Sequence, residues 1–176
     1  MEDIFGSVVP PTEEDRENNA IEAQQGYQSK TYVIVDTTVL LGNLESVDRL
    51  IHNEGFFRNY LFFLTTTVIK ELERLQQSRA DNLSRLARET LAYLDVVTEW
   101  WHGDRIIVQH NDDFEVANRA FPNRQLASNQ IIKSALLLQE RGISTKMWTL
   151  NRGMKLQCRG SGIGLFNPDH CNVPNH

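Results

Sequence analysis

Residues 33–44 read VIVDTTVLLGNL, in which a short apolar run is followed at once by an aspartate, two threonines and a second apolar run. A continuous run of branched apolar residues such as residues 33–35 is typical of a strand that is buried on both faces. Asp36 is therefore predicted to lie at the carboxyl end of a buried strand. Residues 148–156, WTLNRGMKL, have the same form, but Asn151 stands in the place of the aspartate.

Outward from this stretch, segments typical of strands alternate with segments typical of helices. Strands are predicted over residues 31–35, 60–66, 105–109, 145–150 and 164–167. Helices are predicted over residues 44–52, 68–78 (with Thr67 as N-cap), 128–142 and 152–158, with a longer one from Asp81 or Ser84 to Trp101. Residues 110–124 are predicted to form a polar loop. This alternation predicts a three-layer α/β/α domain with a mainly parallel central sheet.

The negative charge of the chain is concentrated at its N-terminus. Residues 1–30 hold seven acidic and two basic residues, so their excess of five acids equals the net charge of -5 of the whole chain. We therefore expect an acidic disordered tail over residues 1–30, one folded domain over residues 31–167 and a flexible C-terminal tail over residues 168–176. The remaining charges balance, which neither supports nor excludes an RNA partner, since a local basic stripe suffices.

The sequence contains no feature that predicts a membrane or secreted protein. No apolar run approaches the roughly 18 residues that a membrane helix needs, and the N-terminus lacks the basic start of a secretory signal. Cys158 and Cys171 have no metal-type spacing. We expect a nuclear or cytoplasmic protein with no membrane partner.

Four polar residues are expected to converge at one edge of the sheet. Ligand sites of open parallel sheets form at the carboxyl ends of the strands, where Asp36 and Asn151 are predicted to lie. Glu71 is placed beside the apolar stripe of its helix, and Asn129 lies near the start of another helix. Four carboxylates in this arrangement would bind Mg²⁺ or Mn²⁺, which prefer oxygen ligands. Two of the four are amides here, so the charge of the site falls from -4 to -2.

The segments that carry this pattern resemble a PIN domain over about residues 31–167: VIVDTTVLL, VIKELERL, SNQIIKSALLL and WTLNRGMKL. PIN domains are the fold of toxin ribonucleases and of eukaryotic RNA-processing endonucleases, and the messenger-RNA surveillance branch is the most similar. The resemblance implies that Asp36 and Glu71 match two acids of the family that ligate Mg²⁺ or Mn²⁺. It also implies that Asn129 and Asn151 replace two catalytic aspartates, so the acidic site is degenerate.

The resemblance also suggests residues for nucleic-acid binding. Thr38 stands where the family commonly has an asparagine, and Thr149 matches a Ser/Thr that often precedes the fourth position. Arg152, Lys155 and Arg159 follow the last site residue and are candidates for phosphate contacts. A solvated helix face is the plainer reading of these three basic residues.

Each site residue also has a plainer structural reading. Asp36, Asn129 and Asn151 could cap a helix or turn, and Glu71 could be one of several exposed helix acids. Asp112 and Asp113 could supply a missing carboxylate, but a solvated position in the polar loop is the plainer reading. Metal-ligand atoms are also present near the C-terminus, in Asp169, His170, Cys171 and His176, but a loose tail is the plainer reading there.

Two functions follow from these observations. In the first, the chain is a PIN-like binding or scaffold module of RNA processing or surveillance, with impaired catalysis and with partners among the proteins of RNA decay complexes. In the second, it is a Mg²⁺- or Mn²⁺-dependent endoribonuclease that cleaves single-stranded RNA. The substitution of amides for two acids favours the first. Engineered introduction of one or both asparagines, to trap an inactive enzyme, would give the same pattern.

Overall fold

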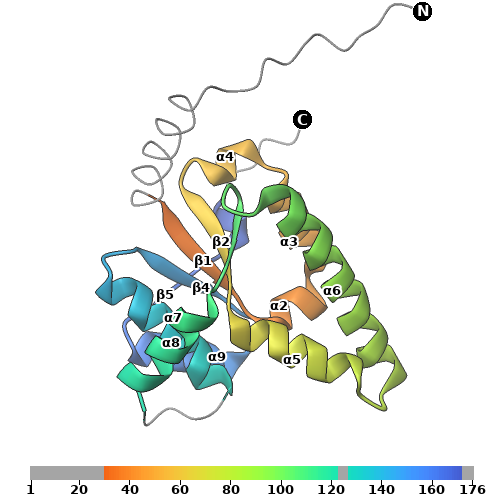
Figure 1. Ribbon diagram of the computed structural model, residues 1–176. Coiled ribbons are helices and arrows are strands. Elements are labelled where there is room, and N and C mark those ends of the chain that lie inside the picture. The colour runs from red at the N-terminus through yellow and green to blue at the C-terminus, as the bar shows by residue number, and fades with distance from the viewer. Residues whose placement is uncertain (1–29, 123–126, 172–176) are drawn as a thin grey trace, which may run out of the picture.

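The computed structural model describes residues 30–122 and 127–171 (Figure 1). Most of the expected acidic tail, and residues 172–176 of the expected C-terminal tail, lie outside the described residues. Residues Pro168–His170, which were expected to belong to that C-terminal tail, form a short 3-10 helix, η1.

The centre of the domain is a five-stranded sheet in which every neighbouring pair is parallel. The strands are β1 (Thr31–Val35), β2 (Tyr60–Leu64), β3 (Ile106–Val108), β4 (Thr145–Trp148) and β5 (Gly164–Leu165), in the order β3-β2-β1-β4-β5. Val33 pairs with Phe62 of β2 on one side and with Lys146 of β4 on the other. β1 is thus the central strand, and its end lies in the middle of the carboxyl edge.

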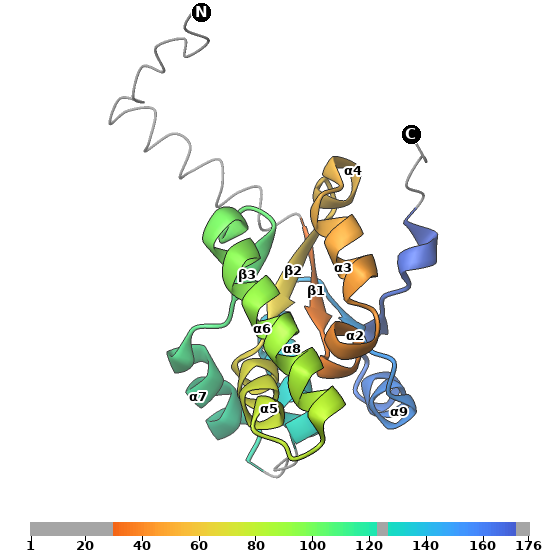
Figure 2. The same cartoon turned by 90° about the vertical axis from the view of Figure 1, so that its right-hand side faces the viewer.

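Helices cover both faces of this sheet, as predicted. They are α2 (Thr37–Gly42), α3 (Leu44–Ile51), α4 (Glu54–Phe57), α5 (Thr66–Gln76), α6 (Asp81–Trp101), α7 (Asn111–Ala120), α8 (Ala127–Glu140) and α9 (Arg152–Gly160). α3 and α6 lie on one face, and α7 and α8 lie on the other (Figures 1 and 2). α2, α5 and α9 begin directly after β1, β2 and β4, so their first turns gather at the carboxyl edge. The three-layer α/β/α prediction is confirmed.

Burial on both faces explains the continuous apolar runs of the strands. Val33 and Ile34 of β1 are fully buried. On one side of the sheet, Phe62 stacks on Trp148 with ring centroids 6.2 Å apart, and Phe166 meets Trp148 edge-on at 5.5 Å. Aromatic contacts of this kind add to the free energy gained from apolar burial.

The predicted polar loop at residues 110–124 is wrong, because residues 111–120 form α7. His110 caps this helix by accepting the backbone N–H of Asp112 at 3.3 Å. Phe114 and Ala117, three residues apart, are the buried face of the helix. α7 packs against α8. The polar composition of the segment reflects its solvent-facing side.

The helix after β2 begins two residues earlier than predicted. Thr65, not Thr67, occupies the N-cap position, where its hydroxyl accepts the backbone N–H of Val68 at 3.3 Å. Two short helices, α2 and α4, were not predicted at all, since each is too short to show a helical period. None of the described helices is long and apolar enough to cross a membrane.

Candidate active site at the carboxyl edge of the sheet

Asp36 sits where β1 ends and α2 begins. Its backbone is extended, with φ -84° and ψ 154°, and its carbonyl accepts the backbone N–H of Val39 at 3.0 Å. Its side chain makes no capping hydrogen bond to α2. The carboxylate is therefore not explained by capping, and it is left to interact across the edge of the sheet.

Two threonine hydroxyls hold one oxygen of this carboxylate. Thr38 Oγ1 donates to Asp36 Oδ2 at 2.8 Å, and Thr149 Oγ1 donates to the same oxygen at 2.6 Å. The two hydroxyl oxygens accept the backbone N–H groups of Leu150 and Asn151 in turn, at 3.1 and 3.0 Å. Asp36 is only 4% exposed, and this network supplies the hydrogen bonds that a buried carboxylate requires.

Glu71 reaches the same place from α5. Thr37 Oγ1 donates to Glu71 Oε2 at 2.7 Å, which ties α5 to the first residue of α2. All three threonines after β1 and β4 thus donate to a carboxylate. None of these contacts was predicted, because Thr38 and Thr149 were expected only to bind nucleic acid and Thr37 was not singled out. The doubled threonine after Asp36 was the signal for them.

Asn151 begins α9 as its N-cap. Its side-chain Oδ1 accepts the backbone N–H of Met154 at 3.1 Å. The amide oxygen is therefore engaged in capping, as the plainer sequence reading allowed. The amide NH₂ group, a donor, and the second lone pair of the oxygen are left to face a ligand.

These groups surround a pocket of about 170 Å³, which we call the acidic pocket. Its lining residues are Asp36, Thr37, Thr38, Leu41, Glu71, Leu75, Ile131, Asn151 and Met154. The structure therefore brings together three of the four predicted catalytic residues, from β1, α5 and α9.

Asn129 does not line the acidic pocket. The pocket is lined on α8 by Ile131, two residues later in the helix. Side chains two residues apart on an α-helix are rotated by about 200° about the helix axis, so they lie on nearly opposite sides. Asn129 therefore faces another direction, and its predicted catalytic role has no geometric support in this pocket.

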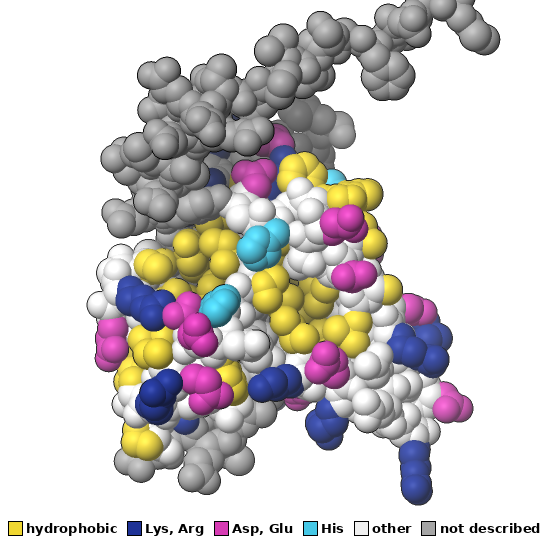
Figure 3. Space-filling view, in the orientation of Figure 1, with side chains coloured by type: hydrophobic (Ala, Val, Ile, Leu, Met, Phe, Trp, Pro, Cys, Tyr) yellow, Lys and Arg dark blue, Asp and Glu magenta, His cyan; other side chains and the backbone are white. Residues whose placement is uncertain are grey.

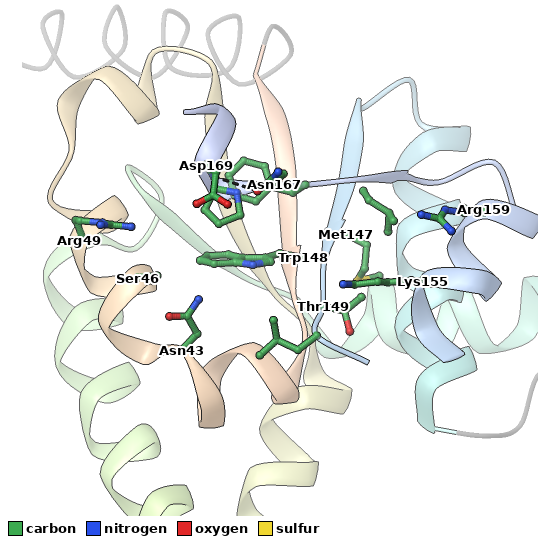
Figure 4. Close-up of a pocket in the computed structure, with 14 residues that line it drawn as sticks. Asn43, Ser46, Arg49, Met147, Trp148, Thr149, Lys155, Arg159, Asn167 and Asp169 are labelled. Carbon is green, nitrogen blue, oxygen red and sulfur yellow. Dashed lines mark hydrogen bonds between the residues drawn. The ribbon is translucent and has the colours of Figure 1, made fainter. Parts of the chain in front are cut away.

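The other predicted nucleic-acid residues divide between two places. Thr38 lines the acidic pocket, whereas Thr149, Lys155 and Arg159 line a second pocket of about 440 Å³ between α3 and α9 (Figure 4). We call this second cavity the α3–α9 pocket. Arg152 is exposed and lines neither pocket.

The other acids considered for the site lie outside the acidic pocket. Asp113 pairs with Arg141 at 2.8 Å, and Asp112 lies 3.4 Å from the ring of His110. Neither lines the acidic pocket. Asp169 lines the α3–α9 pocket instead.

The donor set at the acidic pocket fits a divalent cation poorly. Within residues 30–122 and 127–171, no group of three or more His, Cys, Asp or Glu side chains is placed to hold a metal ion. Two carboxylates remain, each with one oxygen already hydrogen-bonded by a threonine. Affinity for hard cations rises with the number of charged ligands, so this set lacks much of what a resident Mg²⁺ or Mn²⁺ would need.

Cys158 lies on the buried side of α9. Burial and, to a smaller extent, the negative charge of Asp36 raise the pKa of its thiol from 9.0 to about 11. The folded state therefore favours the protonated thiol, and this contribution to stability is present below about pH 9 and is lost as the pH rises toward 11.

We expect Cys158 to resist thiol reagents in the folded protein, because the thiolate is the reactive form. In a colorimetric thiol titration at pH 8, the partly exposed Cys171 should react first, and Cys158 should react only after denaturant is added. Equal reaction rates of the two thiols in the folded protein would contradict this placement of α9.

Comparison with known protein families agrees with this geometry. The family model described as the PIN domain matches residues 33–166. This match covers β2 to β5, the last three residues of β1 and the acidic pocket. No curated protein sequence matches the chain significantly. The chain therefore belongs to the PIN domain family.

Proposed function

We propose that this PIN domain binds single-stranded RNA without hydrolysing it at an appreciable rate. It would serve as a binding or scaffold module in RNA processing or surveillance, in the nucleus or the cytoplasm, with protein partners from RNA decay complexes. One observation carries the proposal: the acidic pocket holds two carboxylates, Asp36 and Glu71, and each is hydrogen-bonded by threonine hydroxyls.

The chemistry of phosphodiester hydrolysis gives this observation its weight. Nucleases that use Mg²⁺ or Mn²⁺ need the metal to activate a water and to stabilise the charge that develops on the attacked phosphate. An amide at residue 151 supplies no negative charge to hold that metal and cannot accept a proton as a general base. Its oxygen moreover accepts the backbone N–H of Met154, which caps α9.

The same pocket remains suited to contact with an RNA strand. The side-chain amide of Asn151 can donate to a phosphate or sugar oxygen, as such groups commonly do in nucleic-acid complexes. Lower negative charge at the edge also reduces repulsion of the RNA backbone. Membership of the PIN family indicates a nuclease-like, RNA-related function, and the proposal keeps the binding part of that function.

A Mg²⁺- or Mn²⁺-dependent endoribonuclease is the second candidate. It rests on Asp36 Oδ1 and Glu71 Oε1, the two carboxylate oxygens to which no described group donates a hydrogen bond. If one ion were held there, Asp36 and Glu71 would be its protein ligands. The two candidates differ in whether RNA binding and metal are coupled.

We expect RNA binding to be independent of divalent metal. The affinity of the full chain for a fluorescent single-stranded RNA, measured by anisotropy, should be the same within about twofold in EDTA and in millimolar Mg²⁺ at matched ionic strength. Binding that requires Mg²⁺ or Mn²⁺ would favour the nuclease. Absence of RNA binding under both conditions would contradict the proposed function.

A further inference from the structure

The α3–α9 pocket carries basic side chains on opposite walls. Arg49 reaches in from α3, whereas Lys155 and Arg159 reach in from α9, on the other side of Trp148 (Figure 4). Asp169 is the one carboxylate among the residues that line it. The pocket therefore has an excess of two positive charges.

The three cations of the α3–α9 pocket are set apart by where they lie. Of the other described arginines, Arg85, Arg105 and Arg141 form ion pairs with carboxylates and the rest do not. No ion pair joins Arg49, Lys155 or Arg159 to a carboxylate of the described residues. The face shown in Figure 3, by contrast, has Lys and Arg interspersed with Asp and Glu. Unpaired cations that converge on a hollow attract an anionic ligand.

An asparagine on the α3 wall has an amide that caps nothing. Four asparagines occupy N-cap positions in the described chain: Asn43, Asn53, Asn151 and Asn167. The last three each accept a backbone N–H at 2.8 to 3.1 Å. Asn43 makes no such bond and lines the α3–α9 pocket instead. Its amide can both donate to and accept from a ligand.

The size and the walls of the pocket fit more than a phosphate group. A volume of about 440 Å³ lies within the range of sites that hold organic ligands. Its apolar walls include Leu150, which is 47% exposed, and Leu165. Cations, a free amide and apolar surface together match the phosphate, edge and face of a nucleotide.

A single wall separates this pocket from the acidic pocket. Thr149 lines the α3–α9 pocket and donates to Asp36, which lines the acidic pocket. The neighbouring Leu150 donates its backbone N–H to Thr38, again across the wall. An extended strand that crosses this wall can occupy both pockets with consecutive residues.

We propose that the α3–α9 pocket is a nucleotide subsite, which takes the base and one phosphate of the RNA residue adjacent to the phosphodiester at the acidic pocket. This inference rests on the proposed function, since it names where the bound strand continues. Lys155 contacts that phosphate from α9, Arg49 contacts the adjoining RNA backbone from α3, and the amide of Asn43 contacts the base edge.

The test measures binding of a fluorescent uridine decamer to the full chain and to charge variants with unchanged melting temperature. Arg49→Ala and Lys155→Ala should each weaken binding about fivefold, and each should lower the slope of log Kd against log salt by about 0.7, the value for one lost single-strand phosphate contact. Arg119→Ala is the matched control, because it removes the same charge from the exposed side of α7, away from both pockets, and it should change binding less than twofold.

A second measurement locates the base directly. A decamer that contains 4-thiouridine should, after irradiation, cross-link to peptides that contain residues 43–49 or 165–169. Cross-links confined to α5 and α2, or pocket variants that behave like Arg119→Ala, would overturn the subsite while leaving RNA binding intact. Absence of any RNA binding would overturn the subsite together with the proposed function. Binding of polyglutamate but not of RNA, with the same dependence on Arg49 and Lys155, would overturn the subsite and assign the pocket to an acidic protein segment.

Discussion

Replacement of Arg105 with alanine is expected to lower the free energy of unfolding by about 3 kcal/mol, which is the sum of a lost charge-assisted hydrogen bond and lost cation–π contact. Arg105 is 7% exposed, and its Nη1 donates to the carbonyl of Ile51 at 2.8 Å. Its guanidinium lies over the ring of Trp101, 3.9 Å from the centroid, and it also pairs with Glu54. Alanine leaves the carbonyl of Ile51 buried without its donor.

Thermal unfolding followed by circular dichroism measures this effect. A loss of about 3 kcal/mol corresponds to a fall in melting temperature of about 6–12 °C for a domain of this size. Arg85→Ala is the control, since Arg85 forms an exposed pair with Glu89 and such pairs contribute under about 1 kcal/mol. Similar melting temperatures for the two variants would show that Arg105 does not fasten α3 and α4 to the sheet.

Conversion of Asn151 to aspartate is expected to create a divalent-cation site. Aspartate caps a helix as well as asparagine does, so one oxygen keeps the N–H of Met154 while the other replaces the amide nitrogen at the acidic pocket. Three carboxylates then face the pocket in place of two. At a free Mn²⁺ concentration ten times the dissociation constant, binding stabilises the folded state by about 1.4 kcal/mol, or about 3–6 °C in melting temperature.

Asn129→Asp is the matched control, because it makes the same chemical change at a residue that does not line the pocket. Mn²⁺ should shift the melting temperature of Asn151→Asp and leave Asn129→Asp close to the unmodified chain. An equal Mn²⁺ shift in both variants would contradict the assignment of the acidic pocket. A large Mn²⁺ shift in the unmodified chain would mean that Asp36 and Glu71 suffice for metal binding.

The sheet and the convergence of Asp36, Glu71 and Asn151 could be predicted from sequence. Polar residues that directly follow parallel strands must meet at one edge, whatever the details of packing. The second turn of α5 adds Glu71, because its spacing from Val68 and Leu75 keeps it beside the apolar stripe. These predictions needed only the period of each element.

The rest depended on how each helix is turned about its own axis. Asn129 misses the acidic pocket because Ile131 faces it, and residues two apart diverge on a helix. Lys155 and Arg159 face the α3–α9 pocket because Met154 and Cys158 are the residues of α9 that are buried. Arg49 and Asn43 line that pocket because of where α3 packs in the fold. The local sequence of residues 43–49 does not predict that packing.

The most direct test of the central claim is a cleavage assay with single-stranded RNA in Mn²⁺, in which the unmodified full chain is compared with Asp36→Asn. We expect the chain to bind the RNA and leave it intact, with no more cleavage than the Asp36→Asn variant. Cleavage by the unmodified chain that disappears in Asp36→Asn, at unchanged melting temperature, would contradict the proposed function and establish a metal-dependent endoribonuclease.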